Sequence, residues 1–183
     1  LRRYWTYERR IDRALRLRLA NVEPAAADLP QRLNRLFDQP APDGVIDWQK
    51  LACALATRGA FSIVTGGPGT GKTTTVVRLL ALLQAPAVES GSPLRIRLAA
   101  PTGKAAARLT ESISQQVLSL TVPDSVREKI PTQVTTVHRL LGSRPGTRHF
   151  RHHLGNPLPL DVLVVDEASM IDLEMMANLL DAL

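Results

Sequence analysis

The sequence has a single cysteine, Cys53, which excludes an internal disulfide and fits a reducing compartment. No run of residues approaches the roughly 18 consecutive apolar positions of a membrane-spanning helix. There is no secretory signal, and the chain starts with leucine rather than methionine. We therefore expect a cytoplasmic protein, and the leucine start suggests a piece of a longer chain.

The sequence has fewer acidic than basic residues. Lysine and arginine total 23 against 17 acidic residues, which gives a net charge of +6 and a pI near 10.2. This excess suits a phosphate-rich partner such as a nucleic acid, although many soluble domains carry a few extra positive charges on a solvated face. The apolar share of 44% is enough for one packed domain with an appendage in 183 residues.

The first 44 residues predict a small helical segment. Over residues 1–20, apolar side chains recur at three- and four-residue steps, which predicts one amphipathic helix. The residues of this stripe are Tyr4, Tyr7, Ile11, Leu15 and Leu19. Residues 29–37 predict a second, short helix, and the turn-rich residues 39–44 predict a linker. We therefore expect one domain over residues 1–44 and another over 45–183.

From residue 45 onward, helices alternate with short apolar strands. The predicted strands are residues 61–65, 94–100 and 160–165. The predicted helices begin at Asp47, Gly71, Thr102 and Leu173. Of the two middle helices, the first is expected to bury Val76, Leu79, Leu80 and Leu83, and the second Ala106, Leu109, Ile113 and Val117. This alternation predicts an α/β fold with a parallel sheet and right-handed crossovers.

A glycine-rich loop follows the first predicted strand and leads into a helix. Its residues are Gly66, Gly67, Pro68, Gly69, Thr70, Gly71, Lys72 and Thr73. Backbone NH groups can converge on a phosphate where no side chain intervenes. Lys72 suits the β- and γ-phosphates, and the Thr73 hydroxyl suits Mg²⁺. The pattern predicts a P-loop that binds the triphosphate of ATP with magnesium.

Two acids end the third predicted strand. Asp166 would hold Mg²⁺, and Glu167 would orient or deprotonate the attacking water. An apolar run followed by two acids is by itself an ordinary strand end. Because a P-loop lies about 95 residues upstream, the pair is interpreted as a Walker B site.

Three further polar groups stay ambiguous from their residues alone. Gln49 could contact the edge of adenine, but an exposed helical glutamine is the more common case. Thr102, Gly103 and Lys104 place a hydroxyl, a bare backbone and a cation at a helix start, which suits a DNA phosphate and equally an ordinary capped helix. A lone histidine such as His138 is more often structural than catalytic.

Together these motifs resemble the RecD family, the α subunits of exodeoxyribonuclease V, which are superfamily 1 DNA helicases. Residues 61–75 resemble motif I of that family, residues 98–109 motif Ia, and residues 136–142 the conserved block that follows. Residues 152–173 resemble motif II with a long flank. The resemblance runs from about residue 47 to the end of the chain, and more loosely over the helical region before it.

The resemblance implies a RecA-like fold, 5′ to 3′ movement along single-stranded DNA, and a complex with the RecB and RecC subunits in double-strand break repair and recombination. It implies that residues 1–44 dock onto those partners. It also implies the roles of single residues. The implied ATP-binding residues are Gln49, Gly66, Gly67, Pro68, Gly69, Thr70, Gly71, Lys72, Thr73 and Thr74. The implied catalytic residues are Lys72 and Glu167, the metal ligands Thr73 and Asp166, and the DNA contacts Thr102, Gly103, Lys104, His138 and Arg139.

A motor of this family also needs a second RecA-like domain, with an arginine that completes the ATP site. The chain stops 16 residues after Glu167, so we expect half a motor. The leading hypothesis is the first motor domain of an ATP-driven DNA helicase, inactive or very slow as a motor alone. The alternative is a nucleotide-binding assembly module without intrinsic hydrolysis. A P-loop kinase would lack the blocks around Lys104 and His138.

Overall fold

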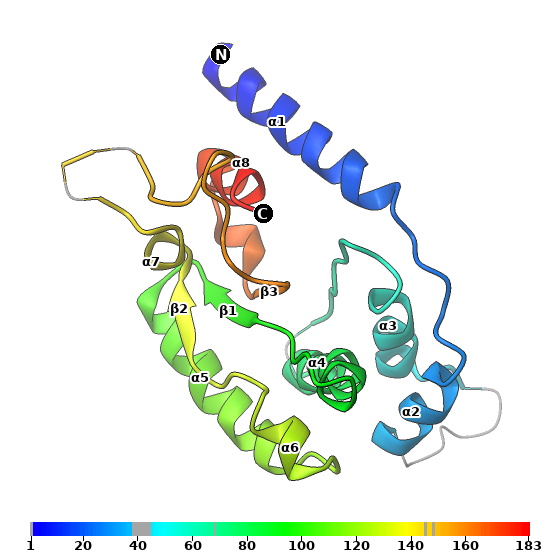
Figure 1. Cartoon of the computed structure of the whole chain (residues 1–183). Helices are drawn as coiled ribbons and strands as arrows, with labels where there is room; N and C mark the ends of the chain where they lie inside the picture. The colour runs from blue at the N-terminus through cyan, green and yellow to red at the C-terminus, as the bar shows by residue number, and fades with distance from the viewer. Residues whose placement is uncertain (1, 38–44, 68, 145, 148) are drawn as a thin grey trace. The chain divides into compact units, whose positions relative to one another are not determined.

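The computed structural model describes residues 2–37, 45–67, 69–144, 146–147 and 149–183 (Figure 1). They form two compact units, and each is described by itself. The first comprises residues 1–17, 95–111 and 131–183, and the second residues 18–94 and 112–130. Among the described helices, none combines the length and the apolar composition needed to cross a membrane.

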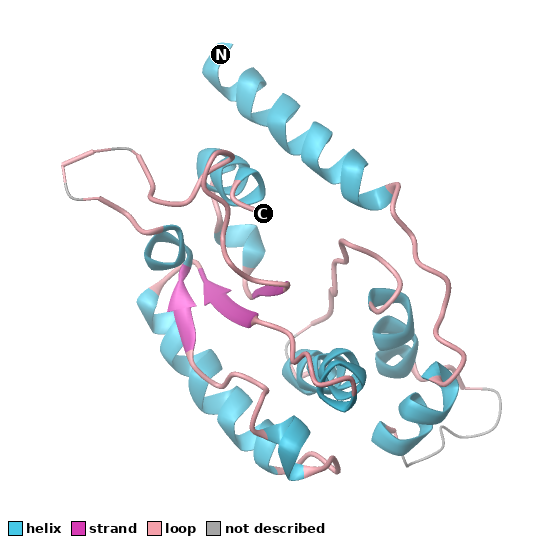
Figure 2. Cartoon of the chain, viewed as in Figure 1, coloured by secondary structure: helices cyan, strands magenta, loops and turns pink. Residues whose placement is uncertain are grey.

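The first unit holds a three-stranded parallel sheet (Figure 2). Its strands are β1 (Ile96–Ala100), β2 (Val134–Thr136) and β3 (Val162–Val165), in the order β2-β1-β3. Leu98 pairs with Val134 on one side of β1 and with Val164 on the other. The predicted parallel α/β fold is confirmed. β2 was not predicted, because three residues are too few to show a strand period.

Helices α7 (Val137–Leu141) and α8 (Leu173–Asp181), with the short turn η1 (Ala168–Met170), complete the core of this unit. Side chains of these two helices pack with Ala99 of β1 and with Leu158, which precedes β3. The buried residues of this core are Ala99, Val137, Leu141, Leu158, Met175, Leu179 and Ala182. Helix α5 (Gly103–Leu118) follows β1, and its predicted face is confirmed because Ala106, Leu109, Ile113 and Val117 are all buried.

Helix α1 (Arg2–Leu19) is joined to α8 by ion pairs rather than by a buried stripe. Arg3 pairs with Glu174 at 3.0 Å, and Arg10 contacts both Asp181 and Asn178. No residue of α1 is fully buried. The predicted amphipathic helix is confirmed. Tyr7, Ile11 and Leu15 of its apolar stripe are half-buried, whereas Tyr4 and Leu19 are 55% and 59% exposed.

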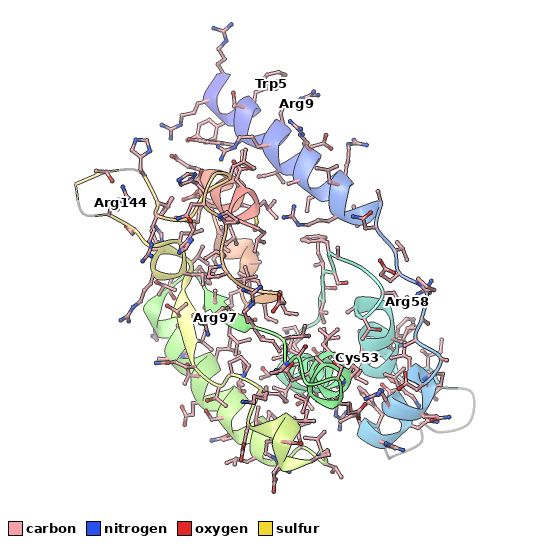
Figure 3. The ribbon with its side chains drawn as sticks, viewed as in Figure 1. Trp5, Arg9, Cys53, Arg58, Arg97 and Arg144 are labelled. Carbon is pink, nitrogen blue, oxygen red and sulfur yellow. The ribbon has the colours of Figure 1, made fainter. Side chains whose placement is uncertain are left out.

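The second unit is built from helices α2 (Leu29–Leu36), α3 (Trp48–Ala56), α4 (Lys72–Glu89) and α6 (Asp124–Arg127). The buried core of this unit consists of Leu29, Leu33, Phe37, Cys53 and Leu82. Of these residues, Cys53 is labelled in Figure 3. Of the predicted stripe on α4, only Leu80 is fully buried, because the face that packs in this unit is centred on Val77, Leu80, Ala81 and Gln84 instead. The fully buried amide of Gln84 is satisfied by the backbone of Leu94 and Lys129.

The predicted strand at residues 61–65 is not formed. Residues 61–67 pair with no other strand among the described residues, and Ile63 is 74% exposed. A β-branched run has strand propensity, but a strand exists only where a neighbour completes its hydrogen-bond ladder. The predicted linker at residues 39–44 lies outside the described residues. The division at residue 44 therefore stays a prediction.

Candidate functional site

The glycine loop of the second unit leads directly into α4. Gly71 is the N-cap of the helix and has a left-handed backbone with φ 77°. The Lys72 ammonium donates hydrogen bonds to the carbonyl oxygens of Gly66 and Gly67, both at 2.7 Å. The Thr70 hydroxyl donates to the Gly67 carbonyl at 2.9 Å. The side chains of the loop thus hold its backbone in a tight turn at a helix N-terminus, the end that attracts anions. Pro68 lies outside the described residues.

Gln49 lies against this loop. It belongs to the first turn of α3, which Asp47 caps as predicted by accepting from the backbone NH of Lys50. The Gln49 amide donates to the Thr70 carbonyl at 3.1 Å. The left-handed φ favours glycine at position 71, and the Gln49 amide lies directly over its Cα. The structure therefore brings Gln49 to the loop, a placement that spacing alone left open.

The start of α4 makes three contacts that sequence reasoning missed. The Thr74 hydroxyl donates to Gln116 at 3.1 Å, and the buried Thr75 hydroxyl donates to the Gly71 carbonyl at 3.0 Å. The Cys53 thiol donates to the Thr75 carbonyl. Burial raises the pKa of Cys53 to about 12, so its thiol stays protonated. The run of three threonines after Lys72 was the available signal, because threonine hydroxyls on a helix bond back to its carbonyls.

In the first unit, three sets of predicted site residues each follow one of the three neighbouring strands of the sheet. Thr102 to Lys104 come after β1, His138 and Arg139 after β2, and Asp166 and Glu167 after β3. Because the strands are parallel, their carboxyl ends lie at one edge of the sheet. The chain therefore gathers hydroxyl, cationic and carboxylate groups at the edge where open α/β folds bind ligands.

The two acids differ in their environment. Asp166 is half-buried, and its backbone NH donates to the Ala99 carbonyl at 3.0 Å, which continues the ladder between β1 and β3. Glu167 is exposed and has φ 49° and ψ 37°, the one described non-glycine residue with a positive φ. This conformation costs an ordinary residue on the order of 1 kcal/mol. The backbone strain therefore falls on the turn that follows β3, at the second of the two acids.

The residues predicted to contact DNA are all exposed. The Thr102 hydroxyl accepts from the Ala105 backbone NH at 3.2 Å, which confirms the predicted cap. Gly103 and Lys104 form the first turn of α5, where helix NH groups are free to meet a phosphate. His138 and Arg139 lie on α7, which Thr136 caps, and the His138 ring meets Phe150 edge-on at 6.2 Å between centroids.

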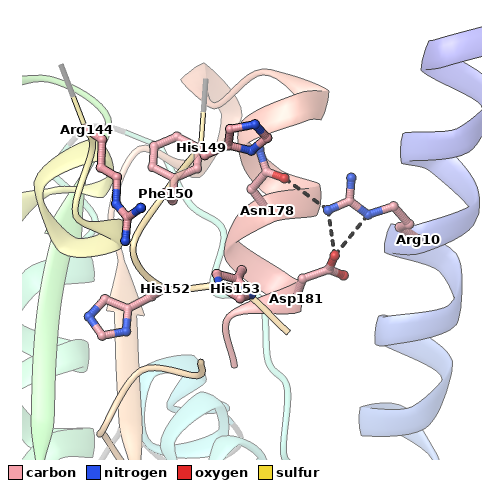
Figure 4. Close-up of a pocket in the computed structure, with 8 residues that line it drawn as sticks. All are labelled: Arg10, Arg144, His149, Phe150, His152, His153, Asn178 and Asp181. Atoms are coloured by element: carbon pink, nitrogen blue, oxygen red, sulfur yellow. Dashed lines mark hydrogen bonds and ion pairs between the residues drawn. The ribbon is translucent and has the colours of Figure 1, made fainter. Parts of the chain in front are cut away.

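A cavity of about 400 Å³ also lies in the first unit (Figure 4). Its wall includes Arg144 and three histidines of the segment before β3, His149, His152 and His153. On the opposite side, Arg10 contacts the Asp181 carboxylate at 2.5 Å and is neutralised by it. None of the sequence-predicted site residues lines this cavity. Over the described residues, no cluster of three His, Cys, Asp or Glu side chains forms a metal site by itself.

The profile of the AAA domain family matches residues 49–183, the part of the chain that carries the loop, the sheet and both acids. The chain belongs to the AAA domain family. Membership of this family implies ATP binding, while Mg²⁺ and the roles of single residues stay predictions.

Comparison with curated proteins identifies individual relatives of the chain. The RecBCD enzyme subunit RecD of Mycolicibacterium smegmatis is 46% identical over 185 residues, which cover 100% of this chain and 32% of the relative. The RecD subunit of Haemophilus influenzae is 45% identical, with 99% and 29% covered. The ATP-dependent RecD2 DNA helicase of Deinococcus radiodurans is 40% identical, with 91% and 22% covered. The predicted resemblance to RecD is confirmed, and the chain spans about a third of the length of its RecD relatives.

Proposed function

We propose that this chain is the ATP-binding part of the first motor domain of a 5′ to 3′ DNA helicase. The whole protein would be a RecD subunit that acts with RecB and RecC in the bacterial cytoplasm, in double-strand break repair and recombination. The observation that carries this proposal is the edge of the sheet, where Lys104, Arg139 and Glu167 follow three adjacent parallel strands. The names of the relatives, RecD subunits and a RecD2 DNA helicase, support it.

The roles of the residues follow from their chemistry. Lys72 would bind the β- and γ-phosphates, Gln49 the adenine edge, and the loop from Gly66 to Thr74 the phosphate backbone through its NH groups. Oxygen ligands suit Mg²⁺, so the Thr73 hydroxyl and the Asp166 carboxylate would hold the ion, which would neutralise phosphate charge. Glu167 would accept a proton from the attacking water.

Single-stranded DNA would lie along the carboxyl edge of the sheet. The exposed Thr102, Gly103 and Lys104 offer a hydroxyl, free helix NH groups and a cation to one phosphate, and Arg139 offers a second cation. Residues 45–183 would then be the first RecA-like domain and residues 1–44 the partner-docking segment. In the whole protein, closure onto a second motor domain would drive each step along the strand.

The proposal predicts a DNA-binding defect in the variant Lys104→Ala of the full-length protein. We expect a higher concentration of single-stranded DNA at half-maximal ATPase stimulation, and a salt dependence of DNA binding weaker by about one unit of slope. Arg108→Ala is the matched control, because Arg108 is an exposed cation one turn further along α5. Stimulation and salt dependence that are equal in Lys104→Ala and the wild type would contradict the DNA contact.

A further inference from the structure

An aromatic side chain is exposed at the start of α3, in the second unit. Trp48 is 70% exposed, and Val45 and Ile46 just before it are 59% and 55% exposed. A tryptophan carries one of the largest apolar surfaces of any residue, so leaving it in water forgoes a large gain from burial. The exposed indole is therefore a surface suited to a ligand or a partner.

The position of Trp48 follows from its two neighbours in the chain. Asp47 caps the helix through the Lys50 backbone NH at 3.0 Å, which orders the first turn. On the other side, Gln49 donates to the Thr70 carbonyl at 3.1 Å and lies directly against Gly71. The first turn of α3 thus lies against the glycine-rich loop. Trp48 lies between Asp47, which caps the helix, and Gln49, which contacts the loop.

A nucleobase needs two different kinds of group around it. Its edge carries donors and acceptors that an amide can match, and its faces are apolar surfaces that aromatic rings cover. We propose that Trp48 stacks on the base of the bound nucleoside triphosphate while Gln49 contacts the edge of that base. This inference rests on the proposed ATP site, and it adds a residue that sets affinity for the base.

Stacking on an aromatic ring does not discriminate among bases, because every base presents a π-face. Trp48 therefore raises affinity for a nucleotide over its bare triphosphate, and it leaves the choice between adenine and guanine to Gln49. The two residues make separable contributions to the same site.

A protein segment is the competing occupant of this surface. Trp48, Leu51 and Leu55 recur at three- and four-residue steps and are 70%, 38% and 58% exposed, so a partner lying along α3 would contact all three. Leu55 lies about two turns beyond Trp48 on the same stripe. Leu55→Ala is therefore the matched control that separates the two occupants.

The experiment measures steady-state ATPase and GTPase of the full-length protein with saturating single-stranded DNA. Inorganic tripolyphosphate serves as a competitive inhibitor that lacks a base. For Trp48→Ala we expect KM to rise about 10-fold for both ATP and GTP, with kcat within about 2-fold and the inhibition constant of tripolyphosphate unchanged. Trp48→Phe keeps a stacking ring and should recover most of the affinity, and Leu55→Ala should match the wild type.

Three results would each overturn the stacking role of Trp48. The first is an unchanged KM in Trp48→Ala, and the second is an inhibition constant of tripolyphosphate that rises as much as KM does. The third is the same rise of KM in Leu55→Ala. A full-length wild-type protein without ATPase activity at saturating single-stranded DNA would instead overturn the proposed ATP site, and the stacking role with it. The two failures are therefore distinguishable.

Discussion

At the scale of single residues, Glu167 combines an unusual backbone conformation with an exposed carboxylate at the candidate site. Its φ of 49° places a non-glycine residue in the left-handed region directly after β3, and its carboxylate is exposed. Such strain persists only where the surrounding structure enforces it, and it is concentrated at functional sites. The sequence predicted the carboxylate from its place after an apolar strand, but residue types alone do not reveal this backbone conformation.

The role of Glu167 leads to a prediction for Glu167→Gln in the full-length protein. An amide cannot accept the proton of the attacking water, so ATP turnover should fall at least about 100-fold while ATP binding persists. Steady-state ATPase assays and calorimetric ATP titration measure the two effects. Lys72→Ala is the contrasting variant, because it removes the cation that we propose contacts the phosphates, and it should lose both turnover and ATP binding. Normal turnover in Glu167→Gln would mean that another group is the base.

At the scale of elements, an ion pair joins the starts of two neighbouring strands. Asp161, just before β3, accepts hydrogen bonds from the backbone NH of Arg95 at 2.7 Å and from its guanidinium at 2.8 and 3.0 Å. These contacts hold the pKa of Asp161 at about 2, below its ordinary value of 3.8. The pairing helps align β1 with β3, and the carboxyl ends of those strands carry the candidate site.

The lowered pKa predicts how stability depends on pH. A carboxylate whose pKa is lower in the folded chain stabilises that chain above its unfolded pKa, and this contribution is lost as the pH falls from about 4 to about 2. We expect Asp161→Asn to lower Tm at pH 7, with the difference from the wild type shrinking over that range. Thermal unfolding followed by circular dichroism measures it.

Glu111→Gln controls for the loss of one negative charge from an exposed position. A Tm difference between Asp161→Asn and the wild type that is the same at pH 2 and pH 7 would rule out the ion pair as its source.

Two strands show the limit of prediction for elements. Residues 61–65 have strand composition and form no strand. Val134–Thr136 was too short to be predicted as a strand, yet it pairs with β1. The longer helices were predicted closely because their hydrogen bonds are local and their caps, such as Asp47 and Thr102, are visible in the sequence. The short helices α6 and α7 were not predicted. A strand depends on a partner from elsewhere in the chain, which local composition does not contain.

At the scale of the whole molecule, the chain covers about a third of the length of its RecD relatives. We predict that the isolated chain binds ATP but hydrolyses it slowly or undetectably. An arginine supplied from outside the phosphate-binding domain can be worth about 10³–10⁵ in rate, and we expect that group to lie in the rest of the protein. Parallel ATPase and unwinding assays on the isolated chain and the full-length protein test this, and robust unwinding by the 183 residues alone would contradict it.

The sequence by itself determined the features that depend on local chemistry. These are the glycine-rich loop with Lys72, the helix caps, the acids after an apolar run and the resemblance to RecD. Only the tertiary structure decided which strands pair, that three polar groups share one sheet edge, and that Gln49 reaches the loop. The physical reason is the distance along the chain over which each interaction acts. Loop and cap chemistry acts over a few neighbouring residues, whereas strand pairing and side-chain contacts join residues that are distant in the chain.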